Sequence, residues 1–171
     1  KNIGYRAFYN CTSLEIEELN LPNLETLGQN AFYGVKIKKI SDLGKLATLP
    51  TATTSTQNFG DKSVLEEVVL PTTLTSIPEF CFRGYKCVIS VDLSNVLSIG
   101  STAFYRANLA DKEINLQSVQ TLGGAAFAFS NITKVVSLGE VTEIAAQANT
   151  GDWLTGQQPG VFAGCSSLTS V

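Results

Sequence analysis

The sequence repeats itself with a period of 22 to 24 residues, and no other feature constrains the fold as strongly. The clearest copies read IGYRAFYNC from Ile3, LGQNAFYGV from Leu27, IPEFCFRGY from Ile77, IGSTAFYRA from Ile99 and LGGAAFAFS from Leu122. Insertions disguise two further copies, which start at Leu49 and Ile144. The repeated phenylalanines are Phe8, Phe32, Phe59, Phe82, Phe104, Phe127 and Phe162. Because seven of the nine phenylalanines share one position, the period is not a chance alignment.

A second pattern, apolar-x-x-apolar-x-apolar, lies between each phenylalanine and the next copy. It is clearest at residues 65–70 and recurs at residues 16–21, 88–93 and 112–116. Its last two apolar positions are two residues apart, which is the spacing of a β-strand. No segment keeps a helical period of 3.6 over 10 residues. Each copy is therefore expected to form one short strand followed by turns or 3₁₀ segments.

One such copy cannot bury its own apolar face, so the copies must stack on one another. We predict a right-handed solenoid of about seven coils, with a parallel β-sheet on one side and short turns or 3₁₀ segments on the other. The phenylalanines should form a continuous stacked spine. The glycines at Gly4, Gly28, Gly100 and Gly123 should mark tight turns of the backbone.

These repeats closely resemble the BspA-like leucine-rich repeat family. The resemblance is carried by SLEIEELNLPNLETLGQNAFYG, VLEEVVLPTTLTSIPEFCFRG and CVISVDLSNVLSIGSTAFYRA, and it covers essentially the whole chain. It implies a leucine-rich-repeat solenoid that acts at the cell surface or outside the cell, in adhesion or in recognition of host proteins, as in host-associated bacteria. The insertions near residues 50–58 and 146–160 depart from the family pattern.

Residues 1–171 are expected to form a single solenoid domain, a fragment of a longer protein. Its repeats start near residues 3, 27, 49, 77, 99, 122 and 144. Two exposed strand edges would remain at the ends of such a fragment, which predicts end-to-end self-association.

Composition removes several classes of function. The net charge is −3 and no run of Lys or Arg occurs, so nucleic acid is not expected as a partner. No stretch reaches the roughly 20 apolar residues that a membrane-spanning helix needs. There is no histidine and no CxxC pair, so we predict neither a metal site nor a cofactor.

Three of the four cysteines are interpreted as packing residues. Cys11 and Cys165 occupy the same repeat position, and Cys81 stands where most copies have alanine, so all three are expected to be small buried fillers. A disulfide between Cys81 and Cys87 is the alternative.

The sequence also lacks the residues of a catalytic site. Without histidine, a nucleophile would need a carboxylate or lysine as its base, and neither GxSxG nor SxxK is present. The pairs Glu17-Glu18 and Glu66-Glu67 could in principle serve glycoside hydrolysis. Both pairs occupy the identical exposed positions of the repeated strand, so we interpret them as solvated surface and expect no catalytic residues and no enzyme activity.

Two surfaces are candidates for ligand binding. The first is the strand face, whose charged positions are mixed in sign and suit a broad protein partner; an ordinary solvated sheet is the alternative. The positions expected to be exposed there are Glu17, Glu18, Asn20, Lys38, Lys39, Ser41, Glu66, Glu67, Val69, Ile89, Ser90, Asp92, Lys112, Glu113, Asn115, Thr133, Lys134 and Val136. Of these, Lys38, Glu66, Glu67 and Lys112 are the candidate ligand contacts.

The second candidate surface is the insertion that carries Trp153, the one tryptophan of the chain. An indole beside Asp152, and close to Gln157 and Gln158, is suited to a sugar face or to a protein hot spot. The alternative is that Trp153 folds back as a hydrophobic plug over the neighbouring coil.

These observations favour a ligand-binding or adhesion module that recognises a host protein or a glycan without covalent chemistry. The main alternative is a structural spacer that presents another domain. A carbohydrate hydrolase is a third and weaker possibility.

Overall fold

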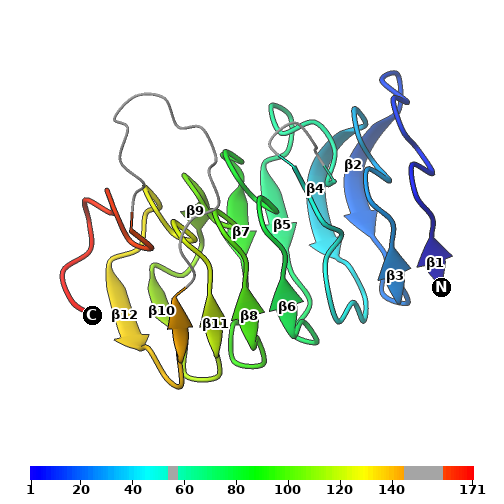
Figure 1. The fold of residues 1–171 in the computed structure, drawn as a ribbon. Coiled ribbons are helices and arrows are strands. Elements are labelled where there is room, and N and C mark those ends of the chain that lie inside the picture. Colours follow the sequence, from blue (N-terminus) through cyan, green and yellow to red (C-terminus); the bar gives the residue numbers. More distant parts are fainter. Residues whose placement is uncertain (54–57, 145–159) are drawn as a thin grey trace.

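The computed structural model describes residues 1–53, 58–144 and 160–171. In these residues the chain forms thirteen short strands and no helix, and every strand pair is parallel. The strands wind into a β-solenoid of about six turns, with the two termini at opposite ends (Figure 1). The predicted parallel solenoid is confirmed, with about six turns rather than the seven coils that the repeats indicate.

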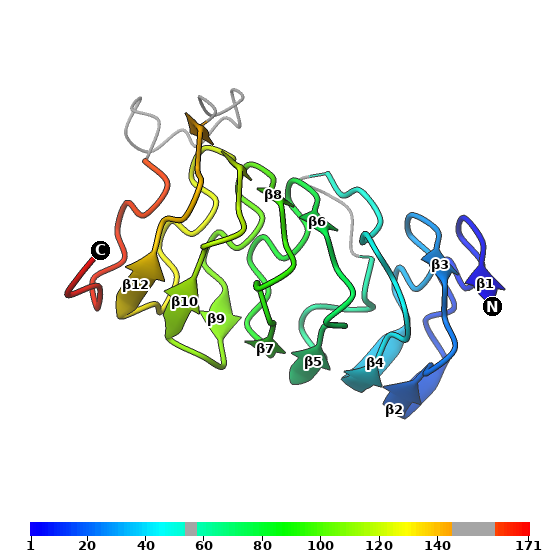
Figure 2. The same cartoon turned by 90° about the horizontal axis from the view of Figure 1, so that it is seen from below.

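One row of strands forms what we call the strand face. Five strands pair in the order β2-β4-β5-β7-β9, and β10 and β12 continue the row as a separate pair, as Figure 2 shows from below. Their bounds are β2 (Glu15–Asn20), β4 (Lys36–Asp42), β5 (Glu67–Val69), β7 (Val88–Ser90), β9 (Asn108–Leu109), β10 (Glu113–Asn115) and β12 (Lys134–Ser137). Apolar residues point inward at alternate positions, as in the pair Val68 and Ile89.

A second row consists of strands of only two residues. Its members are β1 (Asn2–Ile3), β3 (Thr26–Leu27), β6 (Ser76–Ile77), β8 (Ser98–Ile99), β11 (Thr121–Leu122) and β13 (Glu143–Ile144). They form two sheets, β1-β3 and β6-β8-β11-β13, and Thr48 joins the larger sheet through a single bridge to Ser76.

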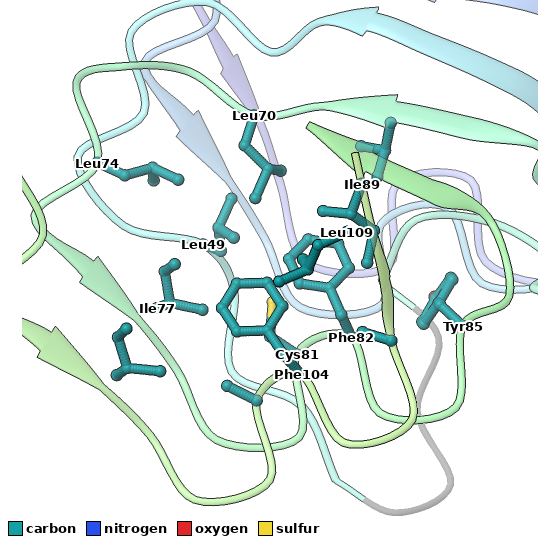
Figure 3. Close-up of a cluster of buried hydrophobic side chains, with 14 of the residues drawn as sticks. Leu49, Leu70, Leu74, Ile77, Cys81, Phe82, Tyr85, Ile89, Phe104 and Leu109 are labelled. Carbon is teal, nitrogen blue, oxygen red and sulfur yellow. The ribbon is translucent and has the colours of Figure 1, made fainter. Parts of the chain in front are cut away.

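The repeated phenylalanines stack in two runs along the core. Neighbouring ring centroids lie 5.2 Å apart for Phe59 and Phe82, 5.7 Å for Phe82 and Phe104, 5.2 Å for Phe104 and Phe127, and 5.8 Å for Phe127 and Phe162. Figure 3 shows the Phe82 and Phe104 rings among buried aliphatic side chains. Phe8 and Phe32 form a separate stack at 5.3 Å. The prediction of one continuous spine is therefore wrong between Phe32 and Phe59, because no ring contact joins these two described residues.

An asparagine side chain bridges this interruption. Asn58 is buried, and its Oδ1 accepts the Asn30 N–H at 2.9 Å. Its Nδ2 donates to the carbonyl oxygens of Pro50 and Thr51, each at 3.0 Å. The insertion before Phe59 displaces the regular ladder here, and the Asn58 amide satisfies backbone groups that would otherwise be buried without partners.

Five of the repeated phenylalanines, Phe8, Phe32, Phe82, Phe104 and Phe127, sit in a sharp corner with a left-handed residue on each side, and Phe162 is followed by one. Residues two before or two after a repeated phenylalanine have φ between 53° and 77°: Arg6, Asn10, Asn30, Gly34, Phe80, Gly84, Thr102, Arg106, Ala125, Phe129 and Gly164. This conformation costs roughly 1–2 kcal/mol for a residue other than glycine. Hydrogen bonds to the next coil offset the cost, as when the N–H groups of Phe80 and Phe82 donate to Ser101 and Ala103 at 3.1 Å and 2.8 Å.

The glycines expected to mark tight turns do begin them, because the carbonyl oxygens of Gly4, Gly28, Gly100 and Gly123 each accept the N–H three residues further on. The turn is not what requires glycine, however. None of Gly4, Gly28, Gly100 and Gly123 has a positive φ. A Cβ on Gly28, Gly100 or Gly123 would instead collide with backbone atoms of the preceding coil, whereas a Cβ on Gly4, in the first coil, would meet nothing within 4 Å. Glycine is therefore required at this position because adjacent coils approach closely.

Two further expectations are corrected by burial. Ile89 was expected on the exposed face but is fully buried, because its pairing with Val68 turns it inward and leaves Val88 39% exposed. Cys11 is exposed, since it lies in the first coil, while Cys81 and Cys165 are buried as expected; Cys87 is buried as well.

Candidate ligand-binding surface

The strand face carries a groove where its hydrogen-bonded ladder is interrupted. β9 pairs with β7, and the Ala110 N–H donates to the Ile89 carbonyl oxygen at 2.8 Å. Residues 110–112 then carry the chain away from β7, so that β10 pairs only with β12. No backbone hydrogen bond joins residues 91–93 to β10, although both segments are described. A groove of about 410 Å³ lies between them.

Asn131 holds the two coils together beside this interruption. Its Oδ1 accepts the Leu109 N–H at 2.8 Å, and its Nδ2 donates to the Leu109 carbonyl oxygen at 3.0 Å and to Asn108 Oδ1 at 2.8 Å. The side-chain amide thus takes the place of a strand backbone along the free edge of β9. The groove therefore has a fixed wall.

The floor of the groove is apolar and its rim is acidic. Buried aliphatic side chains line the floor: Leu70, Ile89, Leu93, Leu109 and Ile114. The rim carries the exposed carboxylates of Asp92, Asp111 and Glu113. Such a lining is suited to a cationic side chain whose aliphatic stem rests on the floor.

The three carboxylates differ in the partners that the protein gives them. Glu113 Oε2 lies 3.5 Å from Lys134 Nζ, and both side chains are largely exposed. Asp92 Oδ1 accepts only the Ser94 N–H, at 2.9 Å. Within the described residues, neither Asp92 nor Asp111 forms an ion pair. Two negative charges at the rim are therefore not compensated by any described residue.

The four strand-face residues predicted as ligand contacts fall into two groups, and none of them lines the groove. Lys38 Nζ lies 3.4 Å from Glu17 Oε2, and Glu67 Oε2 lies 3.1 Å from Lys39 Nζ, so these two link adjacent coils. Glu66 and Lys112 are exposed and form no ion pair with any described residue.

The other predicted contacts, Asp152, Trp153, Gln157 and Gln158, lie outside the described residues. The groove itself was not predicted from the sequence. One sequence feature could have indicated it: the segment from Leu109 to Leu116 spans seven positions, whereas the matching segment of the preceding repeat, from Ile89 to Leu93, spans four.

The described residues contain no cluster of three or more His, Cys, Asp or Glu side chains that could hold a metal ion. None of the described segments forms a helix that is long and apolar enough to cross a membrane. Cys81 and Cys87 are free thiols, so the alternative of a disulfide between them is not realised. Burial raises the pKa of the Cys87 thiol to about 12 and also raises the pKa of Cys81, so both thiols are protonated at neutral pH and poorly nucleophilic.

Comparison with known proteins gives one match. A family model described as "BspA type Leucine rich repeat region (6 copies)" matches residues 1–53 and 52–156. Neither the curated proteins nor the solved structures contain a significant match. The matched ranges cover most of the chain, which confirms the resemblance inferred from its repeats.

Proposed function

The chain belongs to the BspA-type leucine-rich repeat family, a non-catalytic interaction fold, and on this basis we propose that it is a protein-recognition module that catalyses no reaction. We also propose that the protein acts at the cell surface or outside the cell, because this family is typically associated with bacterial surface proteins.

The observation that carries this proposal is the groove between residues 91–93 and β10. Its occupant is an extended segment of a partner protein that carries a Lys or Arg side chain. The aliphatic stem of that side chain would rest on Val69 and Val91, which are partly exposed in the groove, and its charged end would reach Asp92 and Asp111. Charge complementarity of this kind favours one partner over another and speeds the encounter.

The proposal can be tested with synthetic hexapeptides and fluorescence anisotropy. A peptide of alternating Lys and Val is expected to bind, while a peptide of alternating Glu and Val is not. The double variant Asp92→Asn/Asp111→Asn should weaken binding about tenfold, because it removes the two uncompensated charges at the rim.

The matched control is Glu18→Gln/Glu140→Gln, which removes two exposed negative charges away from the groove. Equal weakening by both double variants would show non-specific attraction and would contradict a built site. The same conclusion would follow if the Lys-Val peptide did not bind at all.

The insertion with Trp153 is a second contact surface in this proposal, on the sequence argument alone. If it binds a ligand, the sole indole should fluoresce at long wavelength and be quenched readily by acrylamide, and Trp153→Ala should weaken ligand capture. A blue-shifted emission that resists quenching would instead support the plug and remove Trp153, Asp152, Gln157 and Gln158 from the proposed site.

A further inference from the structure

The corners of the solenoid carry a second surface, of opposite charge to the groove. All three arginines of the chain, Arg6, Arg83 and Arg106, lie there, one or two residues from a repeated phenylalanine. None of the nine lysines lies within two residues of a repeated phenylalanine. The arginines therefore lie at the corners of the solenoid, and the lysines lie elsewhere.

Arg83 and Arg106 belong to a column of alternating aromatic rings and guanidinium groups. The Arg83 guanidinium carbon lies 5.9 Å from the Phe80 ring centroid and 5.4 Å from that of Tyr105. The Arg106 guanidinium carbon lies 5.3 Å from the Tyr105 centroid and 5.5 Å from that of Phe129. We call these five residues the arginine column.

A smaller group of the same kind lies in the first turns. The Arg6 guanidinium carbon is 4.9 Å from the Tyr5 ring centroid and 4.6 Å from that of Tyr9. Tyr9 in turn stacks on Tyr33 of the next coil, with centroids 4.9 Å apart. The same chemistry therefore occurs in separate turns of the solenoid.

No described acidic side chain is an ion-pair partner of an arginine. The ion pairs among the described residues are formed by lysines or by the N-terminus, and none involves an arginine. A guanidinium whose face is covered by a ring keeps its in-plane N–H donors directed outward. Those donors match the oxygens of a carboxylate or a sulfate in a bidentate arrangement.

Aromatic rings beside these donors are exposed in both groups. Tyr5 and Tyr9, beside Arg6, are 61% and 41% exposed; in the arginine column Phe129 is 46% exposed, whereas Tyr105 is buried and supports the two guanidinium groups from below. A ring face bears partial negative charge and is apolar, so it attracts the polarised C–H groups of a sugar ring. Exposed rings next to unpaired guanidinium groups combine the two features needed to hold a sugar that carries an acidic group.

We propose that the arginine column binds a linear anionic polysaccharide whose sugars carry carboxylate or sulfate groups. The column runs along the stacking direction with ring-to-cation distances between 5.3 and 5.9 Å, so it presents two guanidinium groups in adjacent coils, with the exposed Phe129 ring beside them, to a repeating polymer. The acidic groove would repel the same ligand, so the two surfaces are independent.

The test uses the whole chain with heparin, polygalacturonate and neutral dextran as probes, measured by calorimetry. Heparin or polygalacturonate should bind, and the preference between them reports whether sulfate or carboxylate is recognised; dextran should not bind. The double variant Arg83→Gln/Arg106→Gln should weaken binding at least about tenfold, because it removes two charge-assisted contacts.

The matched control is Lys62→Gln/Lys86→Gln, which removes two exposed positive charges elsewhere and should change affinity by less than about twofold. Equal weakening by the two double variants, or binding to neither acidic polysaccharide, would overturn the proposal. Equal or tighter binding of polyglutamate would assign the column to acidic peptides instead. If Arg83→Gln/Arg106→Gln unfolds, the variant Arg83→Lys/Arg106→Lys replaces it, since it keeps charge and bulk but loses the bidentate geometry. Weaker binding by this variant would support the proposal, and unchanged binding would contradict it.

Discussion

The Asn58 side chain accepts the backbone N–H of Asn30 at 2.9 Å, in the place where other corners present a backbone carbonyl of the next coil. Replacing Asn58 with alanine would leave that N–H and the carbonyls of Pro50 and Thr51 without this partner. We expect Asn58→Ala to lower the free energy of unfolding by roughly 1–3 kcal/mol, measured by urea denaturation. Asn95→Ala is the control, because Asn95 donates one exposed hydrogen bond to Thr72, and it should change stability by about 0.5 kcal/mol or less. Similar losses from both variants would contradict a bridging role for Asn58.

Close approach of coils predicts that Gly123→Ala is strongly destabilising. The added methyl group would lie against the backbone of Gly100 and Ser101, which cannot move without parting two coils. Overpacking of this kind costs typically 1–3 kcal/mol, and the midpoint of thermal unfolding should fall accordingly. Gly4→Ala adds the same methyl group in open space and should leave the midpoint nearly unchanged. If Gly123→Ala were as harmless as Gly4→Ala, the stated reason for glycine here would be wrong.

The phenylalanine stack predicts a gradient of stability along the rod. Phe104 is fully buried between Phe82 and Phe127, so Phe104→Ala should cost about 3–5 kcal/mol. Phe8 is 39% exposed and stacks on Phe32 alone, so Phe8→Ala should cost about 1 kcal/mol. Chemical denaturation of the two variants provides the comparison. Equal destabilisation would argue against stability built from contacts between neighbouring coils.

Burial separates the four thiols by reactivity. Cys11 is exposed, whereas Cys81, Cys87 and Cys165 are buried. Iodoacetamide at pH 8 should therefore modify one cysteine rapidly in the folded protein and four after denaturation, as counted by mass spectrometry. Rapid modification of Cys81 or Cys87 in the folded state would mean that the core is far more open than described.

The raised thiol pKa values also make stability depend on pH. The Cys87 thiol has an ordinary pKa of 9.0 and a folded-state pKa of about 12, so above pH 9 the unfolded chain loses a proton that the folded chain keeps. Its contribution to stability is complete below pH 9 and is lost as the pH rises toward 12. In Cys87→Ala, the fall in the free energy of unfolding between pH 9 and pH 10.5 should be shallower by about 1 kcal/mol per pH unit. An unchanged slope would show that Cys87 ionises equally in both states.

The repeat period was sufficient to predict the solenoid, because only stacking can bury one apolar stripe per 22 to 24 residues. It was not sufficient to orient every strand. In the run from Cys87 to Val91 four of five residues are apolar, so alternation does not distinguish an inward Ile89 from an outward one. Pairing with Val68 decides the orientation, and that is a relationship between coils rather than within one.

The positions of the two bridging asparagines were beyond a pattern-based prediction for the same reason. Asn58 and Asn131 matter because the ladder fails beside them, and where a ladder fails depends on how inserted residues are accommodated in three dimensions. The left-handed residues at the corners gave no signal either, because phenylalanine, threonine and alanine occupy positions where glycine would have been expected. The groove and the arginine column both follow from such contacts between coils.

The strand face, the second row of strands and the phenylalanine stack are interrupted at different places along the solenoid. The phenylalanine stack and the second row are interrupted between Phe32 and Phe59, where β4 and β5 remain paired on the strand face. The strand face is interrupted before β10, where Phe82, Phe104 and Phe127 stack without a gap and β8 pairs with β11. Where one set of contacts between neighbouring coils is interrupted, another set continues. A force that pulls the coils apart along the solenoid axis is therefore opposed by paired strands or stacked rings at both interruptions.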